Sequence, residues 1–120
     1  MIAAVRAVRP DFSVLSGFDE YYLVNRVSGG DGVLCGLTNV EPELFARMHA
    51  AYQGGDFATA VSCAERIARL MAVYDVCDLF ISSIKAAVAA KGLPISTRIC
   101  EPAVQATPEQ VEAVRALLAE

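Results

Sequence analysis

The sequence contains no hydrophobic run long enough to cross a membrane, although 55% of its 120 residues are hydrophobic and its mean hydropathy is +0.43. A membrane-spanning helix needs about 20 consecutive apolar residues, and charged residues such as Arg6, Arg9 and Lys85 interrupt the most apolar stretches. The N-terminal apolar stretch is also too short for a secretory signal. We therefore expect no membrane contact, and the excess of apolar residues predicts that part of the surface meets protein.

Clustered basic residues are also missing, because the formal net charge is −4 and the pI is near 4.9. Binding to nucleic acid requires clustered Lys and Arg, so we expect no nucleic-acid partner. The chain has one histidine and four cysteines, none of them in a C-x-x-C pair: Cys35, Cys63, Cys77 and Cys100. This pattern argues against a zinc site and a disulfide framework. We expect free thiols in a reducing cytoplasm, with no metal ion and no cofactor.

The first part of the chain predicts a strand–helix–strand unit. The expected elements are a helix over residues 2–9, a strand over 12–15, a helix over 19–28 and a strand over 33–37. The second strand is apolar without alternation, which is typical of a parallel sheet buried on both faces. In the helix 19–28 we expect Tyr22, Leu23 and Val27 to face inward. Two strands make a poor sheet on their own, so further strands are expected beside them.

The rest of the chain predicts only helices. One begins at Pro42 and ends at Gly54, and the next begins with Asp56 as its cap. The apolar stripe expected on that second helix is Val61, Ala64, Ile67, Ala68 and Met71. A third helix covers about residues 79–91, and a capping box at residues 107–110 opens the last one. We therefore divide the chain into a β/α segment, residues 1–41, and a helical segment, residues 42–120.

Two loops follow the carboxyl ends of the expected strands, at residues 16–20 and 36–39. These are the positions where α/β folds carry their chemistry. The glycine-rich residues 28–32 enter a strand at the opposite end and lack the G-x-G-x-x-G spacing, so we interpret them as a turn. Asp19 and Glu20 in the first loop allow two interpretations. They either offset the dipole of the following helix or accept hydrogen bonds from the hydroxyl groups of a sugar-like ligand.

Three segments carry a resemblance to a known family: SVLSGFDEYYL, GGDGVLCGLTNVEPELF and IKAAVAAKGLPIS. Together they resemble the dihydrodipicolinate synthase / N-acetylneuraminate lyase family, and the G-F-D-E loop is more similar to its 2-keto-3-deoxy sugar acid aldolase branch. The resemblance implies an α/β fold. This chain would be the C-terminal portion of a TIM (β/α)₈ barrel, namely its last two β/α units followed by a C-terminal helical extension. Such a barrel needs about 250 residues, so the first six strands have no counterpart here.

The resemblance also implies a reaction. Members of the family bind pyruvate or a 2-keto acid as a Schiff base on a lysine, which then supports carbon–carbon cleavage, condensation or dehydration. That lysine and the relay tyrosine have no match here, because Lys85 falls within a helix and Lys91 at a helix end. We therefore expect no catalytic residue in this chain. The residues that match substrate-binding positions are Gly17, Asp19, Glu20, Leu34 and Gly36.

Gly36 stands where sialic acid lyases place a serine, which argues against that substrate. Its neighbour Cys35 is either a small buried packing residue, which we favour, or a nucleophile.

The leading hypothesis is that the chain is the C-terminal fragment of a Schiff-base lyase or synthase and is inactive alone. Its partners would be a complementing N-terminal half or further copies of itself, and the complete enzyme would take pyruvate or a 2-keto sugar acid. The alternative is a non-enzymatic helical module for oligomerisation or partner binding. A third hypothesis is an unrelated small α/β binding domain, since a fold does not determine function.

Overall fold

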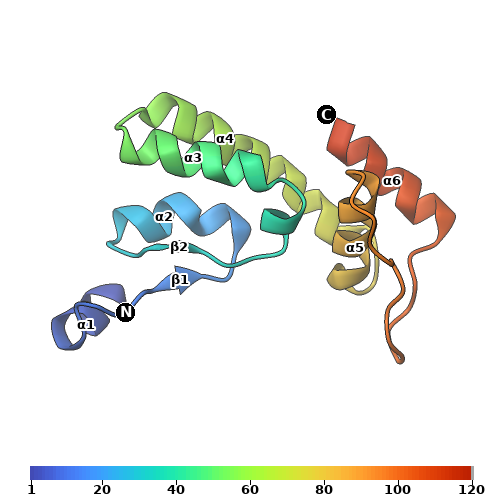
Figure 1. Ribbon diagram of the computed structural model, residues 1–120, viewed down its shortest axis with the longest axis horizontal. Helices are drawn as coiled ribbons and strands as arrows, with labels where there is room; N and C mark the ends of the chain where they lie inside the picture. The colour runs from blue at the N-terminus through green and yellow to red at the C-terminus, as the bar shows by residue number, and fades with distance from the viewer. Residues whose placement is uncertain (120) are drawn as a thin grey trace.

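The computed structural model describes residues 1–119 and is mostly helical (Figure 1). Its elements are α1 (Ile2–Val8), β1 (Leu15–Ser16), the 3-10 turn η1 (Asp19–Tyr21), α2 (Tyr22–Val27), β2 (Gly32–Val33), η2 (Leu37–Asn39), α3 (Pro42–Gln53), α4 (Phe57–Leu70), η3 (Met71–Asp75), α5 (Phe80–Ala90) and α6 (Pro108–Ala119). Within these residues no helix is both long enough and apolar enough to cross a membrane. The order of the elements confirms a strand–helix–strand unit followed by helices.

The two strands run parallel, with Leu15 beside Gly32 and Ser16 beside Val33, and α2 connects them. Both strands are shorter than predicted. The first begins late because the amide of Val14 donates to the Asp31 carboxylate at 2.7 Å and not to a neighbouring strand. The second ends early because the Thr38 hydroxyl donates to the Cys35 carbonyl at 2.5 Å, which supports the turn η2 in place of extended backbone.

The helix expected over residues 19–28 divides into η1 and α2. Tyr22 is buried and Leu23 is half-buried, as predicted, but Val27 is 70% exposed, so its predicted inward position is wrong. A residue five positions after Tyr22 is rotated by about 140° around the helix axis, which turns it away from the face that Tyr22 buries.

Helices α3 and α4 form an antiparallel pair that lies above α2 and β2 in Figure 1. The turn between them contains Gly55 in the left-handed region, at φ +77, and the carboxylate of Asp56 accepts from the amide of Thr59 at 3.1 Å. That bond confirms Asp56 as the cap of α4. The small side chains of Ala60 and Cys63 are fully buried, which allows the two helices to approach closely.

The buried stripe of α4 differs from the predicted one. Its buried residues are Ala60, Cys63, Ile67 and Leu70. Val61 is 49% exposed and Ala68 is also exposed, so both were wrongly placed in the core. Each of them lies one position after a buried residue, and one position turns a side chain by about 100°. The helical periodicity is compatible with burial of either face of α4. The structure buries the face that carries the small residues Ala60 and Cys63.

The C-terminal helices α5 and α6 pack on each other and on η3. The capping box of α6 is confirmed: the amide of Gln110 donates to the Thr107 hydroxyl at 3.3 Å, and the amide of Thr107 donates to the Gln110 side chain at 2.9 Å. On α5, Ser83 is buried and its hydroxyl accepts from the amide of Cys77 at 3.1 Å. The bond between Cys77 and Ser83 holds the segment that follows η3 against α5.

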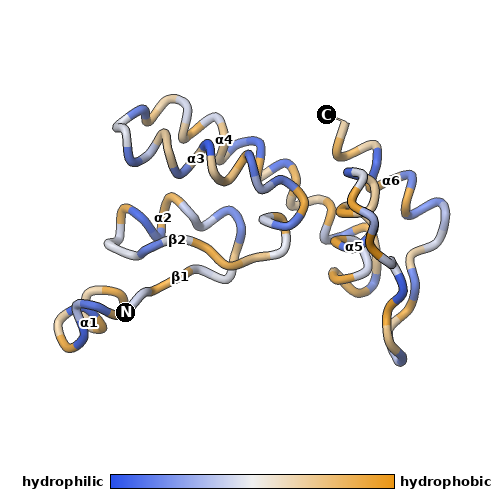
Figure 2. The backbone as a smooth tube through the Cα atoms, in the orientation of Figure 1, coloured by the Kyte–Doolittle hydropathy of each residue, from blue (hydrophilic) through white to orange (hydrophobic). Residues whose placement is uncertain are grey.

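A single hydrophobic core runs through most of the chain, from Tyr22 and Leu37 to Ile67 and Val114. It crosses residue 41, so the two predicted segments share one core; the division itself stays a prediction about sequence organisation. The strand side of the N-terminal region lies outside this core. Large apolar side chains remain exposed there, among them Phe12, Phe18 and Leu34, although both faces of the strand pair were expected to be buried. Figure 2 shows orange, apolar segments along α1, β1 and β2 at this edge of the molecule.

Substitution on the two faces of α4 tests the core assignment. Ile67→Ala removes a fully buried side chain and is expected to lower the free energy of unfolding by about 2–5 kcal/mol. The matched control, Val61→Ala, changes an exposed side chain on the same helix and is expected to change it by less than about 0.5 kcal/mol. Urea denaturation followed by circular dichroism measures both, and equal losses would contradict the assigned face.

Candidate functional site

The carboxyl ends of β1 and β2 lie at one edge of the strand pair, because the strands are parallel. A cavity of about 470 Å³ opens at this edge, between the two loops that follow the strands and the segment joining α4 to α5. Its lining residues are Gly17, Phe18, Asp19, Leu34, Cys35, Gly36, Met71, Tyr74 and Phe80. The loops of the β/α segment and residues of the helical segment therefore form one site.

Four of the sequence-predicted site residues line this cavity: Gly17, Asp19, Leu34 and Gly36. The fifth, Glu20, is exposed and is not among the lining residues. Sequence reasoning did not identify Met71, Tyr74 and Phe80 as site residues; the first two belong to η3 and Phe80 begins α5. The only sequence signal for them is that aromatic residues interrupt the helical pattern between the two helices.

The carboxylate of Asp19 is the central polar group of the site. Asp19 is only 3% exposed, and both of its oxygens have partners within the chain. One oxygen accepts from the amide of Leu37 at 2.8 Å, and the other accepts from the Tyr74 hydroxyl at 2.7 Å. Asp19 therefore joins three segments, whereas the simple helix-capping interpretation requires a bond to the amides of its own turn. Each carboxylate oxygen has two lone pairs, so these two bonds leave the carboxylate with further acceptor capacity.

Burial and the Asp19 carboxylate hold two neighbouring groups in their neutral forms. The pKa of the Cys35 thiol is raised to about 12, first by burial and then by the hydrogen bond to Asp19 and its charge. The pKa of the Tyr74 hydroxyl is raised by burial, and by its hydrogen bond to Asp19. At neutral pH both groups remain protonated and donate to the carboxylate. Cys35 is therefore a packing residue that carries a weak donor, as favoured from the sequence, and not an activated nucleophile.

Gly36 occupies a position where no side chain fits. A Cβ atom added there would lie 2.4 Å from the Tyr74 hydroxyl oxygen and 3.2 Å from two atoms of Ile84. The Tyr74 hydroxyl thus fills the space that a side chain at residue 36 would occupy. By contrast, a Cβ atom on Gly17 would meet nothing within 4 Å.

The two lysines of the chain do not line the cavity. The ammonium group of Lys85 donates to the carbonyl of Arg98 at the surface, and that of Lys91 pairs with Glu41 at 2.9 Å. Among residues 1–119, no three His, Cys, Asp or Glu side chains are grouped so that they could hold a metal ion.

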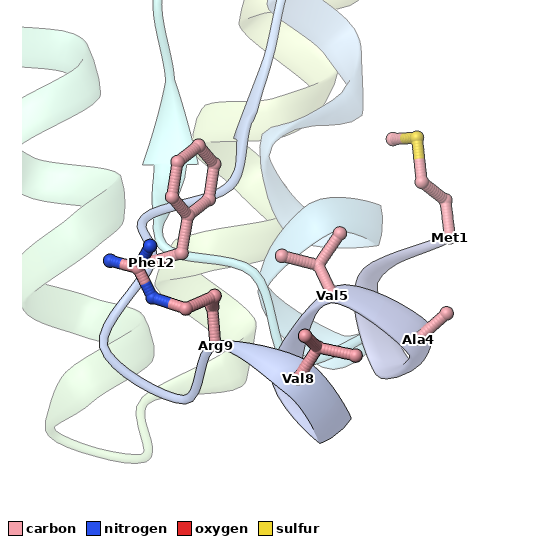
Figure 3. Close-up of a pocket in the computed structure, with 6 residues that line it drawn as sticks. All are labelled: Met1, Ala4, Val5, Val8, Arg9 and Phe12. Carbon is pink, nitrogen blue, oxygen red and sulfur yellow. The ribbon is translucent and has the colours of Figure 1, made fainter.

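A second hollow lies beside α1, away from this site (Figure 3). It is lined by Met1, Ala4, Val5, Val8, Arg9 and Phe12. Its only charged side chain, Arg9, pairs with Asp11 at 2.9 Å, so no polar group is directed at a ligand. The hollow is part of the exposed apolar edge of the N-terminal region and offers no chemistry of its own.

The fold and the site define an α/β protein whose polar cluster lies at the carboxyl ends of parallel strands, with a helical region completing the pocket. A family model confirms the class: the dihydrodipicolinate synthetase family matches residues 1–120. The chain belongs to this family.

Relatives and solved structures agree with this assignment. The chain is 36% identical over 118 residues to the probable 2-dehydro-3-deoxy-D-pentonate aldolase YjhH of Escherichia coli K12, covering 98% of this chain and 39% of YjhH. Its structure is similar to that of YagE, a prophage protein of Escherichia coli K12 solved in complex with pyruvate, with a TM-score of 0.93, 28% identity and coverage of 99% of this chain and 40% of YagE. The dihydrodipicolinate synthase of Thermotoga maritima matches with a TM-score of 0.85 and 29% identity, over 98% of this chain and 39% of that protein.

The chain thus spans about two fifths of the length of the proteins it matches. Those proteins include dihydrodipicolinate synthases, whose fold is a TIM barrel, so the chain corresponds to part of an α/β fold.

Thiol alkylation tests the protonation state of the site. At pH 8, iodoacetamide is expected to modify the exposed Cys100 quickly and Cys35 far more slowly, because little Cys35 is thiolate below a pKa of about 12. The rate at Cys35 should rise with each unit of pH. Peptide mass mapping of samples quenched at intervals gives both rates in one experiment. Equal rates at pH 8 would show that Asp19 and burial do not protect this thiol.

Proposed function

We propose that this chain is the C-terminal part of a Schiff-base lyase, comprising the last two β/α units of its barrel and the helical extension. The reaction would release pyruvate from a 2-keto-3-deoxy sugar acid or run in the reverse direction. One observation carries the proposal: nearly the whole chain superimposes on a family member solved with pyruvate, and its own pocket opens at the carboxyl ends of both strands.

The proposed role of this chain is to bind substrate. Gly17, Leu34 and Gly36 line the pocket at the strand ends, where the backbone can approach a ligand. The Asp19 carboxylate keeps acceptor capacity beyond its bonds to Leu37 and Tyr74, which suits a hydroxyl group of a sugar acid. Glu20 is exposed beside the pocket, and we propose that it contacts the distal end of a longer substrate.

The imine-forming lysine would come from outside these 120 residues. A lysine that forms an imine must present its amine to the substrate in a pocket. Lys85 and Lys91 lie on the helical segment and are engaged at the surface by Arg98 and Glu41. Neither lysine lines the pocket that contains Gly17, Asp19, Leu34 and Gly36.

Borohydride trapping tests this division of roles. With pyruvate and borohydride, the chain alone is expected to gain no carboxyethyl adduct, because neither lysine reaches the pocket. YagE under the same conditions is the positive control, since it is solved with pyruvate. Intact mass followed by peptide mapping detects the adduct. Labelling of Lys85 or Lys91 would show that this chain forms the imine itself and would overturn the proposal.

The exposed apolar edge supports a partner that completes the barrel. Val8, Phe12 and Leu15 are exposed in the first 34 residues, on the side where a barrel would have further strands. A complementing N-terminal portion or further copies of the chain would cover this edge, in a cytoplasm that keeps the four free thiols reduced. The second candidate function is a helical oligomerisation module, which the same exposed apolar edge would also serve.

Complementation separates the two candidates. The chain is co-expressed with the portion of YjhH that it does not match, and pyruvate formation from 2-dehydro-3-deoxy-D-pentonate is followed. We expect activity only when both pieces are present. The control is each piece alone at the same concentration. If the chain forms a stable oligomer by analytical ultracentrifugation and the mixture is inactive, the helical module is the better account.

A further inference from the structure

Tyr74 is a residue of the helical segment that reaches into a pocket built by the barrel loops. Its hydroxyl donates to Asp19 at 2.7 Å and lies where a side chain on Gly36 would be. Its ring packs beside Phe80, with the ring centres 5.9 Å apart, so the side chain is held from two sides. Tyr74 follows Asp19 by 55 positions, and no local motif marks it.

Among residues 1–119, no cationic side chain lines the pocket. Its charged member is the Asp19 carboxylate, and its other side chains are apolar or neutral, including Phe18, Leu34, Met71 and Phe80. An anion placed here would meet a buried carboxylate and find no positive partner, which costs free energy in a site of low dielectric constant. A hydroxyl group would instead find an acceptor on Asp19 and an acceptor lone pair on Tyr74.

We propose that Tyr74 determines substrate specificity: it orients Asp19 and fills the space above Gly36, so that this pocket admits the uncharged, hydroxyl-bearing end of a short 2-keto acid and excludes its carboxylate. This inference rests on the proposed function and assigns the pocket to one end of its substrate. The hydroxyl of Tyr74 limits the depth of the pocket, because the space it occupies is closed to ligand and to any larger residue at position 36.

The first experiment measures the coupling between Tyr74 and Gly36 in the chain alone. Gly36→Ala is expected to lower the urea midpoint of unfolding, because its Cβ meets the Tyr74 oxygen at 2.4 Å. In the Tyr74→Phe background, which lacks that oxygen, the same substitution should lower the midpoint by less than half as much. Gly17→Ala is the matched control, since a Cβ there meets nothing within 4 Å. Equal effects of Gly36→Ala in both backgrounds would overturn the steric part of the proposal.

The second experiment uses Cys35 as a reporter inside the pocket. The probes are iodoacetamide, which is neutral, and iodoacetate, which carries a carboxylate. The ratio of their rates at Cys35 is expected to favour the neutral reagent more strongly in the folded chain than in the urea-unfolded chain. Tyr74→Phe should bring this ratio closer to that of the unfolded chain, because Asp19 then lacks the phenol donor that holds its carboxylate at the pocket. A ratio that is the same folded and unfolded would overturn the proposed exclusion of carboxylates.

The third experiment uses the chain assembled with the YjhH portion. Preference for a five-carbon over a six-carbon 2-dehydro-3-deoxy acid, measured as the ratio of kcat/KM, is expected to fall by about tenfold in Tyr74→Phe. A change of kcat alone, equal for both substrates, would indicate a merely structural role and contradict the proposal. If the unmodified assembly is inactive, the proposed function fails, while the first two experiments still decide whether Tyr74 shapes a neutral pocket.

Discussion

The buried carboxylate of Asp19 is the interaction on which the site depends. It joins the loop after β1, the turn after β2 and the segment after α4, through its bonds to the Leu37 amide and the Tyr74 hydroxyl. The carboxylate and the Leu37 amide are buried, so leaving either without its partner would cost about 1–3 kcal/mol. Burial first, and then the carboxylate, raise the pKa values of Cys35 and Tyr74. The Asp19 carboxylate therefore contributes to the packing of the three segments, to the charge of the pocket and to its shape.

This arrangement explains why the helical segment belongs to the site. In a barrel the loops after the strands supply the binding groups, yet here the back wall of the pocket is built by Met71, Tyr74 and Phe80. The Gln110 side chain of α6 donates to the carbonyl of Val76 at 3.0 Å, and the Cys77 amide donates to Ser83 at 3.1 Å, so both bonds hold the chain just after that wall. Residues outside the loops that follow the strands thus shape this pocket.

The sequence pattern divides the chain at residue 41, whereas the structure separates a continuous core from an exposed apolar edge in the N-terminal region. The core extends from Tyr22 to Val114 and leaves out the strand side of the N-terminal region, where Phe12, Phe18 and Leu34 are exposed. Two residues of pairing per strand give few hydrogen bonds, and further strands would be needed to bury both faces of the pair. Part of the apolar excess visible in the composition is exposed at this edge, and part is exposed on the helical segment, at residues such as Phe57 and Val104.

The sequence by itself determined the order of the elements and the caps at Asp56 and Thr107, because each depends on neighbours within a few positions. The resemblance to a family supplied four of the residues that line the pocket. The sequence pattern misplaced Val27, Val61 and Ala68. A helical period does not say which of two adjacent faces is buried until the partner helix is present. Only the tertiary structure placed Tyr74 against Asp19 and Gly36, since a contact between residues 55 positions apart is set by the packing of the whole chain and leaves no local pattern.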